Sequence, residues 1–177
     1  MTSPLLPHLI LGLFGAGAWL VILAHASRAP AKRLWPPRRA TLWTVVWSWG
    51  LTIAIYVGLI RLGLAEGNAL GLSDGLRFGI GLPITVAGSV LQSWGTAALG
   101  LRATSGWPKG ADTPDMASTK GPYCFTAHPQ YIGQSMSFVG IALASGGIWV
   151  WVVAVAGCFA LLRAAQVEDV HLRRSDF

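Results

Sequence analysis

Long apolar runs alternate with short polar stretches along the whole chain. Four runs contain no acidic or basic residue: 5–26, 41–60, 78–101 and 132–162. An α-helix needs about 20 apolar residues to cross the hydrocarbon core of a bilayer. Each of the first three runs therefore predicts one membrane-spanning helix, and the fourth run is longer than one span requires.

The fourth run contains the sequence Ser145-Gly146-Gly147, and a Gly-Gly pair is typical of a turn. It therefore predicts two helices that form a tight hairpin. Small residues in the first of them favour close helix contact: Gly133, Ser135, Ser137, Gly140, Ala142 and Ala144. The five predicted helices span about 5–26, 41–61, 77–101, 129–145 and 148–170. The competing interpretation has four spans, the last being one long tilted helix.

The run 5–26 could instead be a secretory signal peptide. It lacks the positively charged segment that precedes the apolar part of such peptides, and it is longer than that part usually is. We therefore interpret it as a membrane helix.

The composition agrees with a membrane protein. Of the 177 residues, 53% are hydrophobic and 11% are charged, whereas about 25% are charged in ordinary soluble domains. These values exclude a disordered chain, a nucleic-acid-binding arm and an ordinary soluble enzyme. The two cysteines cannot form a disulfide framework. We expect one all-α, polytopic membrane domain over residues 1–177.

The basic residues predict the orientation of this domain. Arg28, Lys32, Arg33, Arg38 and Arg39 share one loop that has no acid, and the positive-inside rule places it in the cytoplasm. The N-terminus is then outside, as is the next loop, which carries Glu66 and Asp74. The loop with Arg102, Lys109 and Lys120 and the basic tail return to the cytoplasm, which favours five spans over four. The net charge of +6 thus indicates topology rather than a nucleic-acid partner, with attraction to anionic membrane lipids as a secondary interpretation. We expect an integral multi-pass protein of the bacterial inner membrane.

Several tryptophans lie near the predicted membrane interfaces. Trp35, Trp43, Trp107 and Trp149 are interpreted as an aromatic belt that sets the depth of the helices. Trp94 lies inside the third helix and is a candidate for substrate contact.

Polar chemistry is concentrated in two regions on the cytoplasmic side, about 102–133 and 163–177. In the first, Pro129 suits the first turn of a helix, so His128 stands at the start of that helix and Tyr131 one turn further. A helix start offers free N–H donors and suits an anion. The alternative, which spacing alone favours, is a helix cap followed by an interfacial tyrosine.

The second region continues the last helix beyond the membrane. Gln166, Asp169 and Arg173 share one face, and Glu168 and His171 share a neighbouring face. The alternative is a solvated helix end with local ion pairs. A di-metal site is rejected because it requires two Glu-x-x-His motifs with further carboxylates, and this chain has one. No metal is expected.

These residues resemble a known superfamily. The matching features are Gly121-Pro122-Tyr123, the pattern His128-Pro129-x-Tyr131-x-Gly133, the small-residue hairpin, Arg163 followed by Glu168 and Asp169, and Trp94 to Arg102 at the end of the third helix. Together they resemble the isoprenylcysteine carboxyl methyltransferases and phospholipid methyltransferases. The resemblance covers about 92–177.

The resemblance implies an all-helical membrane enzyme that binds S-adenosylmethionine on the cytoplasmic side of its last hairpin. It assigns cofactor contacts to Gly121, Pro122, Tyr123, His128, Tyr131, Gly133, Glu168 and Asp169, and catalytic roles to His128, Tyr131 and Glu168. The acceptor would be a lipophilic molecule or lipid: a prenylcysteine-type carboxylate, a phospholipid or small amine, or a thiol. Trp94, Arg102 and Arg163 are the candidates for contacts with it.

The chain departs from the superfamily pattern at two places. The superfamily usually has an arginine before the histidine, where this chain has Ala127, and Arg102 and Arg163 are candidates to replace it. It also usually continues past the phenylalanine that is Phe177 here, so we expect a shortened tail. Two alternatives follow: a non-catalytic membrane subunit that retains the fold, and an NADPH-dependent enzyme similar to sterol reductases.

Overall fold

All regular structure that the computed structural model describes, in residues 4–37, 41–100 and 121–175, is helical. The long helices are α1 (Leu6–Arg28), α2 (Leu42–Glu66), α4 (Leu82–Leu99), α6 (Pro129–Ser145) and α7 (Ile148–Ser175). Short elements join them: η1 (Pro30–Lys32), α3 (Asp74–Leu76), the π-helical turn η2 (Arg77–Gly81) and the 3-10 turn η3 (Gly121–Cys124). The all-α prediction is confirmed for these residues.

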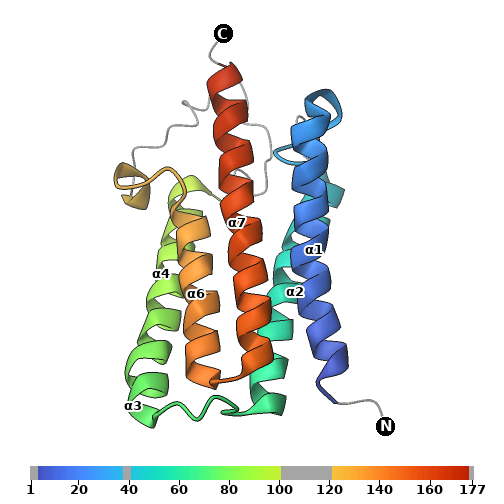
Figure 1. Cartoon of the computed structure of the whole chain (residues 1–177). Coiled ribbons are helices and arrows are strands. Elements are labelled where there is room, and N and C mark those ends of the chain that lie inside the picture. The colour runs from blue at the N-terminus through green and yellow to red at the C-terminus, as the bar shows by residue number, and fades with distance from the viewer. Residues whose placement is uncertain (1–3, 38–40, 101–120, 176–177) are drawn as a thin grey trace.

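The long helices lie side by side as a bundle (Figure 1). Helix α4 packs along α6, and α7 packs against α1, α2 and α6. Residues Leu59, Leu62, Phe138, Val150 and Val153 are fully buried between these helices. In Figure 1, the end of α4, η3, the start of α6 and the C-terminal part of α7 lie at one end of the bundle, and the α6–α7 turn lies at the other.

Within the described part of the chain, three helical segments are long and apolar enough to cross a membrane: Leu6–Arg28, Leu42–Glu66 and Ile148–Val170. Large apolar side chains such as Phe14, Val21 and Leu64 point away from the bundle and are well exposed. An apolar outer surface of this extent suits contact with lipid rather than water. Helices α4 and α6 have 18 and 17 residues, which is the short end of the range for a span.

The predicted hairpin is confirmed. Helix α6 ends at Ser145, and Gly146 follows in the left-handed conformation with φ 68°. Glycine adopts this conformation without steric cost, and it commonly ends a helix in this way. Helix α7 begins at Ile148, where the Glu66 carboxylate accepts hydrogen bonds from the backbone N–H groups of Ile148 and Trp149. A single long helix through this region is therefore excluded.

The helical stretch predicted over 77–101 is continuous through the described residues 77–99, but it opens with a π-helical turn that was not predicted. The π-helical turn Arg77–Gly81 precedes α4, and Pro83 lies in the first turn of α4. Proline has no N–H to continue the regular hydrogen-bond ladder, so the geometry changes before it. The side chain of Arg77 donates a 3.0 Å hydrogen bond to the carbonyl of Ala144, which ties this turn to the end of α6.

Three tryptophans form a cluster between α1, α2 and the segment after η1. The ring centroids of Trp19 and Trp35 are 5.2 Å apart, those of Trp19 and Trp47 are 5.5 Å apart, and those of Trp35 and Trp47 are 6.2 Å apart. Trp35 is 6% exposed, so its assignment to an interfacial belt is wrong. Trp43 and Trp149 are well exposed and remain belt candidates, while Trp107 lies outside the described residues.

Candidate functional site

Four polar side chains from the two helices of the hairpin meet at one end of the bundle. Pro129 begins α6, so His128 stands at its N-cap position and Tyr131 in its first turn. Helix α7 runs antiparallel to α6 (Figure 1). Glu168 and Asp169, near the C-terminal end of α7, therefore meet His128 and Tyr131. We call His128, Tyr131, Glu168 and Asp169 the polar cluster.

His128 contacts both carboxylates of the polar cluster. Its Nε2 lies 2.9 Å from Oδ1 of Asp169, and its Nδ1 lies 3.6 Å from Oε2 of Glu168. The first distance is that of a hydrogen bond and the second is longer than one. The imidazole also stacks on the ring of Tyr131, with centroids 5.6 Å apart and planes inclined by 20°. The orientation of the imidazole is therefore fixed from several sides.

The two carboxylate oxygens of Glu168 have different surroundings. Oε1 accepts hydrogen bonds from the hydroxyl of Tyr131 and from Nε1 of Trp35, the latter at 2.9 Å. Oε2 is directed toward His128. The side chain of Glu168 is 21% exposed and that of Asp169 is 48% exposed. A ligand can therefore reach both carboxylates.

These contacts bear on the structural alternatives that the sequence left open for His128, Tyr131 and the two acids. The side chain of His128 makes no capping hydrogen bond to the start of α6; it contacts Asp169 instead. Tyr131 bonds Glu168 rather than lying free at an interface. His128 thus occupies the N-cap position without capping the helix through its side chain. The interpretation of Glu168 and Asp169 as acids with purely local partners is wrong, since His128 and Tyr131 lie at the start of α6.

The turn η3 adds Tyr123 beside the polar cluster. Burial raises the pKa of the Tyr123 phenol to about 12, and the negative charge of Glu168 adds to the shift. The preceding Pro122 is buried, and Gly121 adopts φ 60°. A Cβ atom at Gly121 would lie 3.1 Å from Nε1 of Trp94. The Gly-Pro-Tyr motif thus packs on the end of α4 and brings Tyr123 toward Glu168.

Gly133 is not part of this arrangement. A Cβ atom at Gly133 would lie 2.6 Å from the backbone N of Gln92 and 2.6 Å from the backbone O of Gly88. Because it occupies the contact between α6 and α4, Gly133 has a role in helix packing, and its assignment to the cofactor stays a prediction.

The arginines assigned to the substrate are not brought into the polar cluster by any described contact. Arg163 donates a 2.8 Å hydrogen bond to Oε1 of Gln166, one turn along α7. Arg102 lies outside the described residues. Ala127, which replaces the arginine of the superfamily pattern, is exposed.

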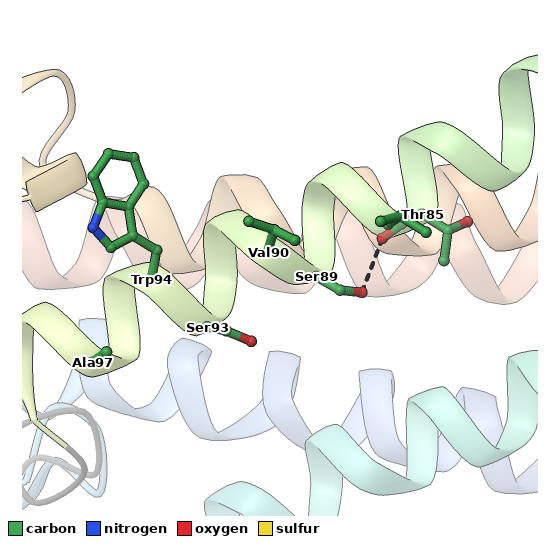
Figure 2. A pocket seen from close by; sticks show the side chains of 7 residues that line it. Thr85, Ser89, Val90, Ser93, Trp94 and Ala97 are labelled. Atoms are coloured by element: carbon green, nitrogen blue, oxygen red, sulfur yellow. Dashed lines mark hydrogen bonds between the residues drawn. The ribbon is translucent and has the colours of Figure 1, made fainter.

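An open groove of about 570 Å³ follows α4 from Thr85 to Ala97. Figure 2 shows its labelled lining residues along this helix, with Trp94 toward one end and Thr85 toward the other. The lining is mainly apolar, and Ser89 satisfies its hydroxyl by donating to the carbonyl of Thr85 at 2.9 Å. Trp94 is half exposed. Since Trp94 also packs near Gly121, the groove leads toward the turn that carries Tyr123.

One member of the site was not expected from the sequence. Trp35 belongs to the N-terminal half, outside the segment that resembles the superfamily, yet it donates to Glu168. Its only sequence signal is its place in the predicted cytoplasmic loop, on the side of the membrane where the site was expected.

Comparisons with known proteins point to one family. The family model described as phospholipid methyltransferase matches residues 76–175. A curated relative, phosphatidylethanolamine N-methyltransferase B of Dictyostelium discoideum, is 28% identical over 95 residues, which cover 53% of this chain and 48% of the relative. The match thus spans about half the length of that relative. No solved structure matches the chain significantly. Because the family match covers more than half of the chain and contains the whole polar cluster, the chain belongs to the phospholipid methyltransferase family.

Proposed function

We propose that this protein transfers a methyl group from S-adenosylmethionine to a lipophilic acceptor at the cytoplasmic face of a membrane. The observation that carries the proposal is the polar cluster: His128, Tyr131, Glu168 and Asp169 converge from two helices, within the segment that matches the family.

The polar groups of the site fit those of S-adenosylmethionine. The cofactor has a diol and an ammonium group, which are hydrogen-bond donors, and the carboxylates of Glu168 and Asp169 are acceptors. Its carboxylate suits the start of α6, where backbone N–H groups are free of intrahelical partners. The half-buried Tyr123 beside Glu168 offers an aromatic surface for the adenine. Glu168, Asp169, His128, Tyr131 and η3 would therefore hold the cofactor.

The acceptor that we favour is the amine of a phospholipid. The family description and the name of the Dictyostelium relative support this class; a prenylcysteine-type carboxylate, a small amine and a thiol are the alternatives. The apolar groove along α4 would receive the acyl part of the lipid from the side, with Trp94 near the reacting end. The 12 residue steps from Thr85 to Ala97 correspond to about 18 Å of helix, close to the thickness of one leaflet of the hydrocarbon core, which is about 15 Å.

The bound cofactor supplies an electrophilic methyl group, and the protein contributes orientation, exclusion of water and proton handling. An amine acceptor must be deprotonated before it can attack. Of the groups that could accept this proton, Tyr131 already uses its hydroxyl to donate to Glu168. His128, held between Asp169 and Glu168, and the partly exposed Glu168 are the remaining candidates.

For the membrane arrangement we propose five spans, formed by α1, α2, α4, α6 and α7, with the N-terminus outside and the polar cluster in the cytoplasm. The basic residues between α1 and α2 and the hairpin of α6 and α7 support it. A bacterial inner membrane remains our prediction for its location.

The test is binding of radiolabelled S-adenosylmethionine to the purified protein in detergent or nanodiscs. We expect saturable binding that Glu168→Gln and His128→Ala weaken by roughly 10- to 100-fold, since each removes a contact with a charged or polar group of the ligand. Asp74→Asn is the matched control, because Asp74 is an exposed acid at the opposite end of the bundle. No saturable binding, or equal binding by all variants, would reject the proposal.

Two further measurements separate the alternatives. A thermal-shift comparison distinguishes S-adenosylmethionine from NADPH, and stabilisation by NADPH alone would indicate the reductase alternative. Methyl transfer to a panel of lipid extracts distinguishes an enzyme from a non-catalytic subunit, because a subunit would bind the cofactor without forming methylated lipid.

A further inference from the structure

We propose that Trp35 is a positioning residue of the cofactor site: its indole N–H fixes the Glu168 carboxylate so that Oε2 is presented to the ligand. The inference rests on the proposed function, because it takes S-adenosylmethionine as the ligand that Glu168 contacts. It extends the site into the N-terminal half, which lies outside the family match at 76–175.

The hydrogen bonds of Glu168 divide its two oxygens. Oε1 accepts from Tyr131 and from Trp35, and a carboxylate oxygen has about two favourable acceptor directions. Oε1 is thus saturated. Oε2 lies 3.6 Å from His128 Nδ1, beyond hydrogen-bond distance, and therefore retains acceptor capacity. A partial turn of the carboxylate about its last bond would lose both donors, and a half-turn only exchanges two equivalent oxygens, so one oxygen is always held and the other presented.

The packing around Trp35 makes it a rigid donor. The ring of Trp35 meets that of Trp19 edge to face, at an interplanar angle of 89°, and that of Trp47 at 79°. Edge-to-face contacts of this kind stabilise aromatic pairs beyond the burial of their area. Since Trp35 is also almost fully buried, its N–H is held at one place relative to α7.

Trp19 provides the matched comparison. It belongs to the same cluster and is similarly buried, at 8% against 6% exposed for Trp35. Its Nε1, however, has no hydrogen-bond partner among the residues that the structure describes. Replacing either tryptophan by phenylalanine keeps an aromatic ring and removes one indole N–H. Only at Trp35 does that N–H hold a carboxylate.

The experiment compares S-adenosylmethionine affinity in Trp35→Phe, Trp19→Phe, Glu168→Gln and the double variant Trp35→Phe/Glu168→Gln, in the full-length protein. We expect Trp35→Phe to weaken binding about 10-fold, as for the loss of a hydrogen bond to a charged group, and Trp19→Phe to leave it within about 2-fold of wild type. In the Glu168→Gln background, Trp35→Phe should have little further effect, because a residue that acts through Glu168 is not additive with it.

A second measurement does not depend on the Trp35 variant folding. In the ¹⁵N-labelled protein, Glu168→Gln should shift one indole N–H resonance far more than the others, because it removes the charge that this N–H faces. Absence of such a shift, equal affinities for Trp35→Phe and Trp19→Phe, or full additivity in the double variant would each overturn the inference. Failure of the wild-type protein to bind S-adenosylmethionine would overturn the proposed function instead, and the indole shift would still report on the bond.

Discussion

At the scale of single residues, the site depends on carboxylates whose neighbours come from separate parts of the chain. Glu168 contacts Tyr131 and His128 across the hairpin and Trp35 from a segment 133 residues away. The closeness of the first two was expected, though not the contacts themselves, because a tight hairpin brings the start of one helix beside the end of the next. The third was not, since no local pattern marks which loop tryptophan will reach back into the bundle.

The phenol of Tyr123 should titrate far above its ordinary range. Its pKa is raised from 10.0 to about 12, first by burial and then by Glu168. An alkaline absorbance titration, taken as the difference between wild type and Tyr123→Phe, should therefore show a midpoint near 12. Between about pH 10 and 12 the folded state keeps a proton that the unfolded state has lost, so the free energy of unfolding should fall as the pH rises.

Glu168→Gln tests the second cause of this shift. Removing the negative charge should lower the midpoint of Tyr123 while leaving the part due to burial, whereas Asp74→Asn should not move it. A wild-type midpoint near 10 would contradict the burial of the Tyr123 phenol and, with it, its placement beside Glu168.

At the scale of helices, the apolar runs predicted the main elements well. The expected ranges 129–145 and 148–170 correspond to α6 and to most of α7, because Pro129, Gly146 and Gly147 act locally on the backbone. The π-helical turn Arg77–Gly81 was missed, since it depends on how Pro83 and Arg77 fit against the end of α6. The motif that assigned Gly133 to the cofactor gave no sign that this residue also lets α4 and α6 approach closely.

Gly88→Ala should separate α4 from α6. A Cβ atom there would lie 2.5 Å from the carbonyl oxygen of Gly133 and 2.6 Å from the backbone N of Ser137. Backbone atoms cannot move aside as a flexible side chain can, so we expect a loss of about 1–3 kcal/mol in the free energy of unfolding. Gly50→Ala is the control, because nothing lies within 4 Å of its Cβ position. Equal stability of the two variants, measured by denaturation in mixed micelles, would argue against the α4–α6 contact.

Glu66→Ala should destabilise the start of α7. The carboxylate accepts from the N–H groups of Ile148 at 2.9 Å and Trp149 at 3.0 Å, which are otherwise unpaired at a helix start. Loss of such a cap costs about 1–2 kcal/mol. Glu66→Gln should retain part of the stabilisation, because its amide oxygen can still accept hydrogen bonds from these N–H groups. Asp74→Ala, at an exposed ion pair with Arg77, should cost at most about 1 kcal/mol. A Glu66→Ala variant as stable as Asp74→Ala would show that the cap contributes little.

At the scale of the whole molecule, the proposed topology makes the hairpin and α4 cross the membrane although α4 and α6 are short. The three longer apolar segments alone, Leu6–Arg28, Leu42–Glu66 and Ile148–Val170, would place everything from the end of α2 to the start of α7 on one side. Five spans instead place Asp74 outside and the turn η3 inside. The two arrangements therefore disagree about the side of Cys124, which is exposed in η3.

Cysteine labelling distinguishes these arrangements. In a Cys158→Ala background, Cys124 is the remaining thiol of the chain's two cysteines, and a membrane-impermeant maleimide should label it in inverted vesicles but not in intact spheroplasts. With Cys124 also replaced, Asp74→Cys should show the opposite pattern and Val170→Cys the same pattern as Cys124. If Cys124 instead labels together with Asp74→Cys, α4 and α6 do not both cross. The polar cluster would then have its two helices on opposite faces of the bilayer, which their hydrogen bonds do not permit.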